Sequence, residues 1–209
     1  ATSSPWLADH IKLTGEASGD SAGAGVTISD LDGDGDADVV VGAYQEDTGA
    51  ENAGAVYIFS EPVNSESLAG SDVKLTGEGA GDLAGHSVTG MGDINGDIYD
   101  DLLIGAFQES SVGTNAGAAY IAYGPLSSGS LTLNIKLTGE MSYDNAGLGI
   151  AGGCDFNGDG EKDFIVGARG ENSETGAVYI RYGPVNSSSS LSTANVKLTG
   201  ETIGDYVGA

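Results

Sequence analysis

A near-constant internal repeat constrains the fold of this chain more than any other feature of its sequence. Copies of the segment KLTGE start 62, 62 and 61 residues apart, at Lys12, Lys74, Lys136 and Lys197. Within each period the same order returns: a Gly-rich stretch, an acidic loop, an apolar run ending in Gly-Ala, and a second apolar run that contains Tyr. Such a period indicates a supersecondary unit that buries its apolar faces against neighbouring copies.

The apolar runs of each repeat have the composition of β-strands. They are short, rich in Val, Ile and Tyr, and bounded by Gly, Asn, Asp or Ser, whereas no stretch shows a sustained helical period. In the first repeat the expected strands are Val26–Ser29, Val39–Ala43, Ala55–Phe59 and Val73–Thr76. Four short antiparallel strands, repeated radially, form the blades of a β-propeller. The sequence therefore predicts an all-β protein made of four-stranded β-propeller blades.

The repeat boundaries predict one domain over residues 1–209. We expect three full repeats of about 62 residues, with blades at approximately 20–77, 82–139 and 144–200, and partial repeats at 11–19 and 201–209. Ragged repeats at both ends favour a segment of a larger ring, and a ring completed by another chain is the alternative. Three blades alone would expose strand edges and an apolar flank.

Three acidic loops follow the first expected strand of each repeat: DLDGDGDAD from Asp30, DINGDIYDD from Asp93 and DFNGDGEKD from Asp155. Oxygen side chains at positions 1, 3, 5 and 9 can converge on one point, and the backbone carbonyl at position 7 can add a ligand. Ca²⁺ takes about six to eight oxygen ligands in flexible geometry. The sequence predicts three calcium sites, with the position-7 residues binding through their carbonyls. The expected ligands are Asp30, Asp32, Asp34, Asp36 and Asp38; Asp93, Asn95, Asp97, Tyr99 and Asp101; Asp155, Asn157, Asp159, Glu161 and Asp163.

Other interpretations of the acidic loops fit less well. Magnesium usually keeps more waters, and zinc prefers His or Cys, which the loops lack. An EF-hand needs Glu at position 12, where this chain has Val41, Ile104 and Val166. Acidic Gly-rich loops can also be solvated turns, but three copies in register favour metal sites.

The second loop differs from the others at position 6, where Ile98 replaces the Gly of Gly35 and Gly160. If this position requires a positive φ, Ile98 is strained, and we expect its site to be distinguishable from the other two. Clustered carboxylates without a cation would destabilise the fold, so a chelator should lower the melting temperature.

Charge and cysteine content exclude several classes of function. Seven basic and 31 acidic residues give a net charge of −24, which argues against nucleic acid and anionic lipid as partners. A salt-loving source is a competing explanation for the acidity. No apolar run is long enough for a membrane span. Cys154 has no second cysteine to pair with, and we expect it to be a small core residue.

The Gly-rich entry, the acidic loop and the strand ending in Gly-Ala together resemble the FG-GAP repeats of integrin α-subunit β-propellers and their bacterial and archaeal relatives. The resemblance runs from about Ile11 to Ala209. It implies that the calcium loops lie on the lower face of the propeller, that the metal is structural, and that ligands bind at the opposite face. The chain departs from the motif where FG is replaced by Ala22-Gly23, Ala84-Gly85, Ala146-Gly147 and Val207-Gly208, and the GAP proline by Tyr44, Phe107 and Arg169.

The loops that vary between repeats are the expected partner surface, because repeat proteins place function in such loops. We expect loops 44–52, 107–115 and 169–174 to bind a protein or glycan. Further blades, from the parent chain or another subunit, are the other expected partners. The predicted function is an adhesion or recognition module at the cell surface or outside the cell, where millimolar calcium is available. The alternatives are a structural subunit of a surface filament or layer and, with less support, a non-catalytic propeller of a secreted enzyme.

An enzyme is not predicted, because the chain lacks a constellation of acid, base and nucleophile. The histidines are His10, expected to be exposed, and His86, which takes the place of Ala24 and Leu148 in the sister repeats. The acidic neighbour of Cys154 disfavours a reactive thiolate. The tyrosines that repeat in the third strand, Tyr57, Tyr120 and Tyr179, are expected to pack rather than to bind a ligand.

Overall fold

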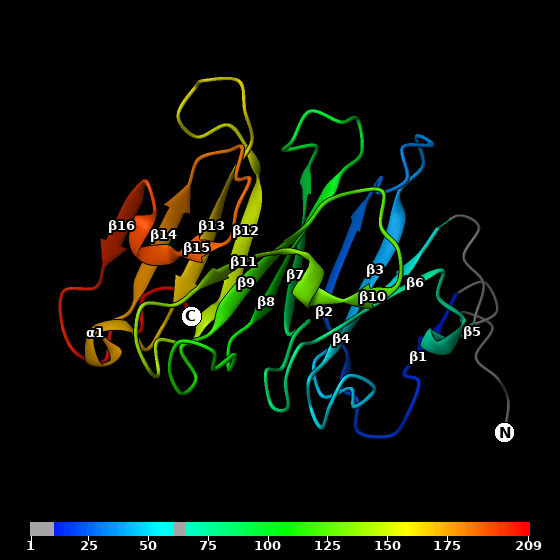
Figure 1. Cartoon of the computed structure of the whole chain (residues 1–209), viewed down its shortest axis with the longest axis horizontal. Coiled ribbons are helices and arrows are strands. Elements are labelled where there is room, and N and C mark those ends of the chain that lie inside the picture. Colours follow the sequence, from blue (N-terminus) through cyan, green and yellow to red (C-terminus); the bar gives the residue numbers. More distant parts are fainter. Residues whose placement is uncertain (1–10, 61–65) are drawn as a thin grey trace, which may run out of the picture.

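A computed structural model describes residues 11–60 and 66–209, so the prediction for His10 lies outside the described residues. Nearly all regular structure is β-strand, and three antiparallel sheets lie side by side in chain order (Figure 1). This confirms the all-β class and the blades of four antiparallel strands.

Blade 1 contains β2 (Ala22–Ser29), β3 (Asp38–Ala43), β4 (Ala55–Phe59) and β6 (Val73–Thr76). Blade 2 contains β7 (Ser87–Gly92), β8 (Asp101–Ala106), β9 (Ala118–Ala122) and β11 (Ile135–Thr138). Blade 3 contains β12 (Ala146–Cys154), β13 (Asp163–Ala168), β14 (Ala177–Arg181) and β16 (Val196–Thr199).

Short parallel strands join each repeat to the preceding one, a feature that the sequence did not reveal. The strand formed by each of the first three KLTGE segments pairs in parallel with a two-residue strand of the following repeat. These pairs are β1–β5, β6–β10 and β11–β15. These strands are β1 (Leu13–Thr14), β5 (Glu66–Ser67), β10 (Gly129–Ser130) and β15 (Ser189–Ser190). A 3₁₀ turn capped by a Ser hydroxyl follows each incoming strand: Leu68–Gly70, Leu131–Leu133 and Leu191–Thr193. The Ser-rich segments Ser127–Ser130 and Ser187–Ser190 are therefore partly anchored.

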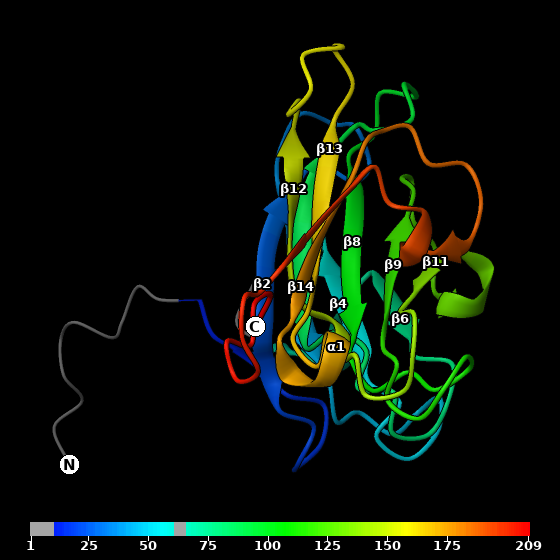
Figure 2. The same ribbon diagram turned by 90° about the vertical axis from the view of Figure 1, so that its left-hand side faces the viewer.

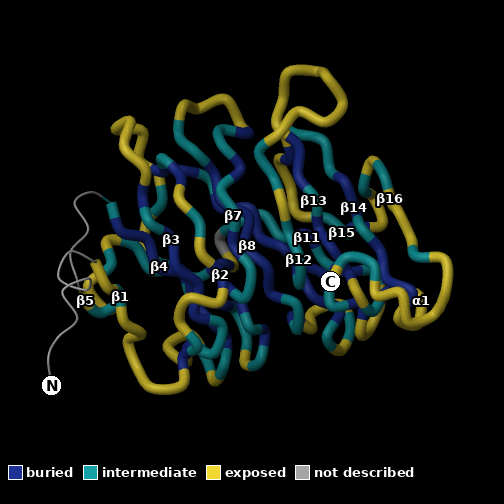
Figure 3. Tube along the Cα trace, turned by 180° about the vertical axis from the view of Figure 1, so that it is seen from behind, coloured by how far each residue is buried: buried dark blue, intermediate teal, exposed yellow. Residues whose placement is uncertain are grey.

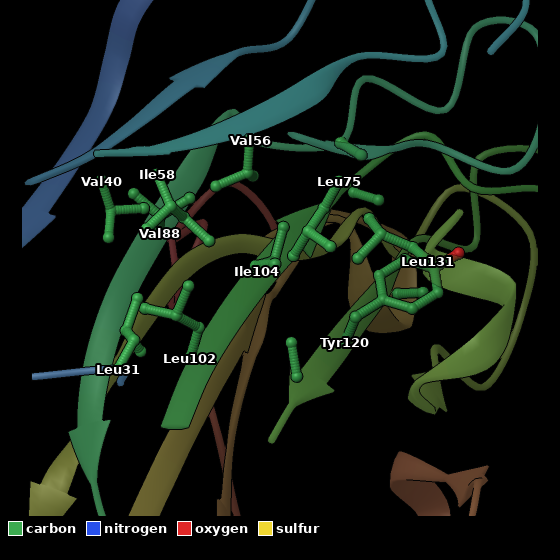
Figure 4. Close-up of a cluster of buried hydrophobic side chains, with 14 residues drawn as sticks. Leu31, Val40, Val56, Ile58, Leu75, Val88, Leu102, Ile104, Tyr120 and Leu131 are labelled. Carbon is green, nitrogen blue, oxygen red and sulfur yellow. The ribbon is translucent and has the colours of Figure 1, made fainter. Parts of the chain in front are cut away.

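The core lies between successive blades, because each strand turns alternate side chains to the two faces of its sheet. Val40, Val56 and Ile58 of blade 1 pack against Val88, Leu102 and Ile104 of blade 2 (Figure 4). A second cluster joins blades 2 and 3 in the same way. β4, β8 and β9 are buried along their whole length, whereas β2 and β16 are largely exposed, as are many of the loops at both ends (Figure 3).

Glycine permits the backbones of neighbouring blades to approach closely at the Gly-Ala pairs. A Cβ on Gly42 would lie 2.0 Å from the carbonyl oxygen of Gly85, and Gly105 meets Gly147 in the same way. Real side chains cannot occupy that space, so the Gly of each pair is a packing requirement. The Gly-Ala and Ala-Gly motifs are therefore two halves of one contact between blades.

The KLTGE segment forms an ionic cluster at each blade junction. Lys74 Nζ lies 2.7 Å from Glu16, which ends the preceding KLTGE, and 3.0 Å from Glu46, which lies in the loop after β3. Tyr57 places its ring 5.0 Å from Lys74 Nζ and donates its hydroxyl to Glu16. The same Lys–Glu pairs recur in the later repeats, where Lys136 binds Glu78 and Glu109 and Lys197 binds Glu140 and Glu171.

The repeated tyrosines pack as expected, since Tyr57, Tyr120 and Tyr179 are at most 1% exposed.

Blade 3 is open on the face that has no following blade. Leu198 is 53% exposed there, whereas its counterparts Leu75 and Leu137 are 3% and 0% exposed. Across the described residues the three sheets do not close into a ring. The expectation that Cys154 is a core residue is wrong, because it ends β12 on this open side and is exposed.

Replacing Lys136 by Met should lower the free energy of unfolding by about 2–4 kcal/mol, because the buried carboxylate of Glu109 would lose its counter-ion while the apolar stem remains. Lys197→Met is the matched control. Lys197 has the equivalent partners of its own repeat, Glu140 and Glu171, but its side chain is 32% exposed compared with 17% for Lys136, so water can replace more of the lost interaction. Urea denaturation should therefore show a smaller loss for Lys197→Met. Equal losses would contradict this explanation.

Candidate metal centre

The three acidic loops lie at the same end of the molecule, each between the first and second strands of its blade (Figures 1 and 2). They connect β2 to β3, β7 to β8 and β12 to β13. The loops in the variable segments after β3, β8 and β13 lie at the opposite end (Figure 1). The blade geometry therefore separates the candidate metal ligands from the candidate partner surface.

Loop 1 brings three carboxylates together. Asp30, Asp32 and Asp34 each offer one oxygen, and these oxygens all lie within 4.8 Å of one another. The first carboxylate is half-buried and the other two are exposed. Three hard oxygen ligands in one exposed loop fit a divalent cation such as Ca²⁺, with the remaining coordination positions available to carbonyl or water oxygens.

The backbone of all three loops is held by the same hydrogen bonds. In loop 1 the carboxylate of Asp30 accepts the N–H groups of Gly33 at 2.8 Å and Gly35 at 3.1 Å. The corresponding donors are Gly96 and Ile98 to Asp93 and Gly158 and Gly160 to Asp155. In loop 3 the N–H of Gly160, joined by neighbouring N–H donors, lowers the pKa of Asp155. Asp155 therefore organises its loop in the charged form.

Loops 2 and 3 differ from loop 1 at position 3. Asn95 donates its side-chain amide to Asp97 at 2.9 Å, and Asn157 donates to Asp159 at 2.8 Å. The side-chain oxygens of both residues already face the loop, where they accept the N–H groups of Asp97 at 3.0 Å and Asp159 at 2.9 Å. An amide oxygen has a second lone pair, which could bind a cation. Loops 2 and 3 thus bring fewer charges to the loop centre than loop 1.

The backbone at position 7 is also held in the same way in each loop. The N–H groups of Asp36, Tyr99 and Glu161 donate to the position-5 carboxylates of Asp34, Asp97 and Asp159 at 2.9–3.0 Å. The role of the position-7 carbonyls as ligands stays a prediction.

The position-9 aspartates have a structural role that the sequence pattern did not reveal. Asp38, Asp101 and Asp163 are at most 2% exposed, and each accepts the N–H of position 2 of its own loop. They therefore close each loop over the start of the following strand. Burial raises the pKa of Asp101 to about 6, although the N–H groups of Ile94 and Gly124 partly offset this effect. A nearby cation would favour the charged carboxylate.

Ile98 adopts the backbone conformation of the glycines that it replaces. Its φ is 81°, compared with 94° at Gly35 and 96° at Gly160, so position 6 does require a positive φ. The Ile98 side chain is 76% exposed. A β-branched residue is strained in this conformation, and its exposed side chain gains no packing in return.

The opposite end carries a cavity of about 720 Å³ beside loop 169–174. This loop contains the single turn α1 (Glu171–Glu174), in which Asn172 and Ser173 have left-handed φ values of 51° and 61°. Arg169 lies 5.1 Å from the ring of Tyr206, whose hydroxyl donates to Glu174 at 2.9 Å. The connection that contains this loop is short, with seven residues between Ala168 and Gly176, whereas ten residues lie between Ala43 and Gly54.

His86 lies between two aromatic rings, those of Tyr44 at 5.2 Å and Phe107 at 4.8 Å. Burial lowers its pKa, which favours the neutral imidazole. His86 is therefore accommodated by local packing between these two rings.

The repeat architecture and its sequence motifs match a known family. The FG-GAP repeat family profile matches residues 22–59 and 146–180, which fall in the first and third repeats. The first and third repeats of the chain are therefore FG-GAP repeats. It is 30% identical to integrin alpha-IIb of Homo sapiens over 168 residues, 32% identical to integrin alpha-6 of Gallus gallus over 157 residues and 38% identical to integrin alpha-11 of Mus musculus over 112 residues.

These matches cover 77%, 74% and 52% of the chain but only 16%, 14% and 9% of the respective relatives. The chain thus spans a small part of the length of its integrin-like relatives. Over residues 11–60 and 66–209, no helix has the length and apolar character needed to cross a membrane.

Replacing Ile98 by Gly in the second blade should raise the free energy of unfolding by up to about 1 kcal/mol, because it removes backbone strain. Gly160→Ala is the reverse test, since a Cβ there meets nothing within 4 Å and would add only the backbone cost. It should lower the free energy of unfolding by about 1–2 kcal/mol. Thermal or urea denaturation measures both. A loss of stability in Ile98→Gly would contradict the proposed strain.

Proposed function

We propose that this chain is part of an extracellular, calcium-stabilised FG-GAP β-propeller that mediates adhesion or recognition of a protein or glycan. The observation that carries the proposal is the convergence of Asp30, Asp32 and Asp34 in loop 1. The hydrogen bonds from the backbone to the position-1 aspartate recur in all three loops and extend the proposal to loops 2 and 3. Similarity to integrin α chains supports a propeller module of this kind. A cell-surface setting agrees with this similarity and would supply millimolar calcium.

In this proposal each FG-GAP loop holds one Ca²⁺ through the oxygens at positions 1, 3, 5, 7 and 9. When bound, the cation supplies positive charge to clustered carboxylates that would otherwise repel one another. The aspartate at position 1 orders the loop, and the aspartate at position 9 anchors it to the following strand. The loop thereby joins the two flanking strands at that end of the blade. The sites would therefore stabilise the blades rather than catalyse a reaction.

Calcium removal should lower the melting temperature of the protein. At a calcium concentration 100-fold above the dissociation constant, each filled site adds about 2.7 kcal/mol to the free energy of unfolding. Asp34→Asn should lower the melting temperature in calcium because it weakens loop 1. In EDTA the same variant should equal or exceed the wild type, because it relieves repulsion among unliganded carboxylates.

Glu51→Gln is the matched control, since it removes one negative charge from an exposed residue of the variable loop after β3. Its melting temperature should follow that of the wild type in both conditions. Scanning calorimetry and calcium stoichiometry measure the effect. If the wild type melts at the same temperature in calcium and in EDTA, the calcium proposal fails.

We further propose that the end opposite to the metal loops binds the partner, through loops 44–52, 107–115 and 169–174. The cavity beside loop 169–174 supports this assignment because it combines exposed Tyr143 and Met141 with the guanidinium of Arg169. Aromatic faces and a charged, hydrogen-bonding group suit both glycan and protein contacts.

Alanine at Arg169 and Tyr143 together should reduce binding to an array of glycans or to immobilised extracellular matrix proteins at least about tenfold. Calcium-bound thermal stability should not change, because both side chains are exposed. Glu161→Ala, at the metal end, is the control and should bind normally since its proposed ligand is the backbone carbonyl. Equal loss in the control would contradict the surface assignment. Calcium-induced polymerisation without binding would instead favour a structural subunit.

We propose that the chain is a segment of a larger ring, with blades at about 20–77, 82–139 and 144–200. The open side of blade 3 supports this boundary, because positions buried in blades 1 and 2 are exposed there. The partial repeats at 11–19 and 201–209 would then each complete a junction with a further blade. That blade could belong to the parent chain or to another subunit.

A further inference from the structure

Asp100, at position 8 of loop 2, connects loop 2 directly to loop 1. Its carboxylate accepts the hydroxyl of Ser29 at 2.8 Å and the N–H of Asp30 at 3.1 Å. Its own N–H donates to the carbonyl of Asp30 at 2.9 Å. Asp30 is the first carboxylate of loop 1, so three hydrogen bonds from a single residue of loop 2 fix the entry to the neighbouring metal loop.

Tyr99 adds packing to this connection. A Cβ on Gly33 would lie 2.9 Å from Cε1 of Tyr99, so the Tyr99 ring rests directly on loop 1. Gly33 is the residue whose N–H orders the carboxylate of Asp30. The neighbouring N–H of Tyr99 donates to Asp97, a candidate ligand of loop 2. A continuous path therefore runs from Asp97 through Tyr99 and Asp100 to Asp30.

Loops 2 and 3 lack an equivalent connection. Position 8 of loop 3 is Lys162, whose Nζ donates to the carbonyl of Gly153 in its own blade. The Lys162 side chain lies beside Gly92 at the start of loop 2 but makes no hydrogen bond to a described residue of that loop. The counterpart of Ser29 is Gly92, which has no hydroxyl. In the described part of the chain, no hydrogen bond joins loop 3 to loop 2. Position 8 thus differs in each repeat: Ala37 in loop 1, Asp100 in loop 2 and Lys162 in loop 3.

We propose that Asp100 is a positioning residue that couples cation binding in loop 1 to cation binding in loop 2. This inference rests on the proposed calcium function. A cation held by Asp93 and Asp97 restricts the segment that carries Asp100, and that segment in turn holds Asp30 in place for loop 1. Binding at one site therefore lowers the entropic cost of ordering the other, which gives positive cooperativity between these two sites. Loop 3 binds independently of the pair.

Calcium titration followed by ¹H–¹⁵N NMR can read each loop separately, because the amides of Gly33, Gly96 and Gly158 donate to the position-1 aspartates of loops 1, 2 and 3. Asp97→Asn weakens loop 2 but keeps an oxygen for the N–H of Tyr99. In the otherwise wild-type chain it should lower the calcium affinity of loop 1 about fivefold, whereas in an Asp100→Ala background the decrease should be less than about twofold.

Lys162→Ala is the control and should leave the coupling of loops 1 and 2 unchanged. Asp100→Asn keeps one acceptor for Ser29 and Asp30 and should retain the coupling, which provides a second test if Asp100→Ala folds poorly. The proposal is overturned if Asp97→Asn leaves loop 1 unaffected, if coupling persists in Asp100→Ala, or if Asp100→Asn loses it completely. Failure of the calcium function would look different, because none of the three glycine amides would shift with calcium.

Discussion

The contact between successive blades is the constraint on which the rest of this structure depends. A single four-stranded sheet with two apolar faces cannot be stable in water, and the neighbouring blades supply the cover. Close backbone approach at the Gly-Ala pairs permits this packing near the inner strands. At the outer strands the parallel two-residue pairing and the Lys–Glu cluster complete it. The metal loops and the variable loops are both positioned by these contacts.

The two ends of the blades differ in how strongly their loops resemble one another. At one end, repeated aspartates make the three loops alike, with the same hydrogen bonds from backbone to carboxylate in each. At the other end, loop length and composition differ, and the shorter third loop borders a cavity lined in part by Arg169 and Tyr206. A rigid scaffold with one uniform and one variable end suits a module whose stability and recognition are separate properties.

Much of this organisation could be predicted from the sequence, because a repeat reports every element several times. The expected strands Ala55–Phe59 and Val73–Thr76 coincide with β4 and β6, and Val39–Ala43 is one residue shorter than β3. The expected strand Val26–Ser29 is the second half of the longer β2. The positive φ at Ile98 followed from comparison with two glycines. The sequence could not show the parallel pairing of β5, β10 and β15, because a two-residue strand has no periodicity to detect. It also misplaced Cys154, since burial there depends on a neighbouring blade rather than on composition.

The KLTGE segment contributes to two junctions at once. Its lysine binds one glutamate of its own blade and the glutamate of the preceding KLTGE segment, as Lys74 binds Glu46 and Glu16. Its glutamate binds the lysine of the following KLTGE segment, as Glu78 binds Lys136. Each repeat therefore supplies a lysine to the junction with the preceding repeat and a glutamate to the junction with the following one. Every junction uses the same Lys–Glu pairing. Duplication or loss of a whole repeat would again place a lysine and a glutamate opposite each other at the new junction. An array of this kind can therefore change its number of blades without evolving a new interface.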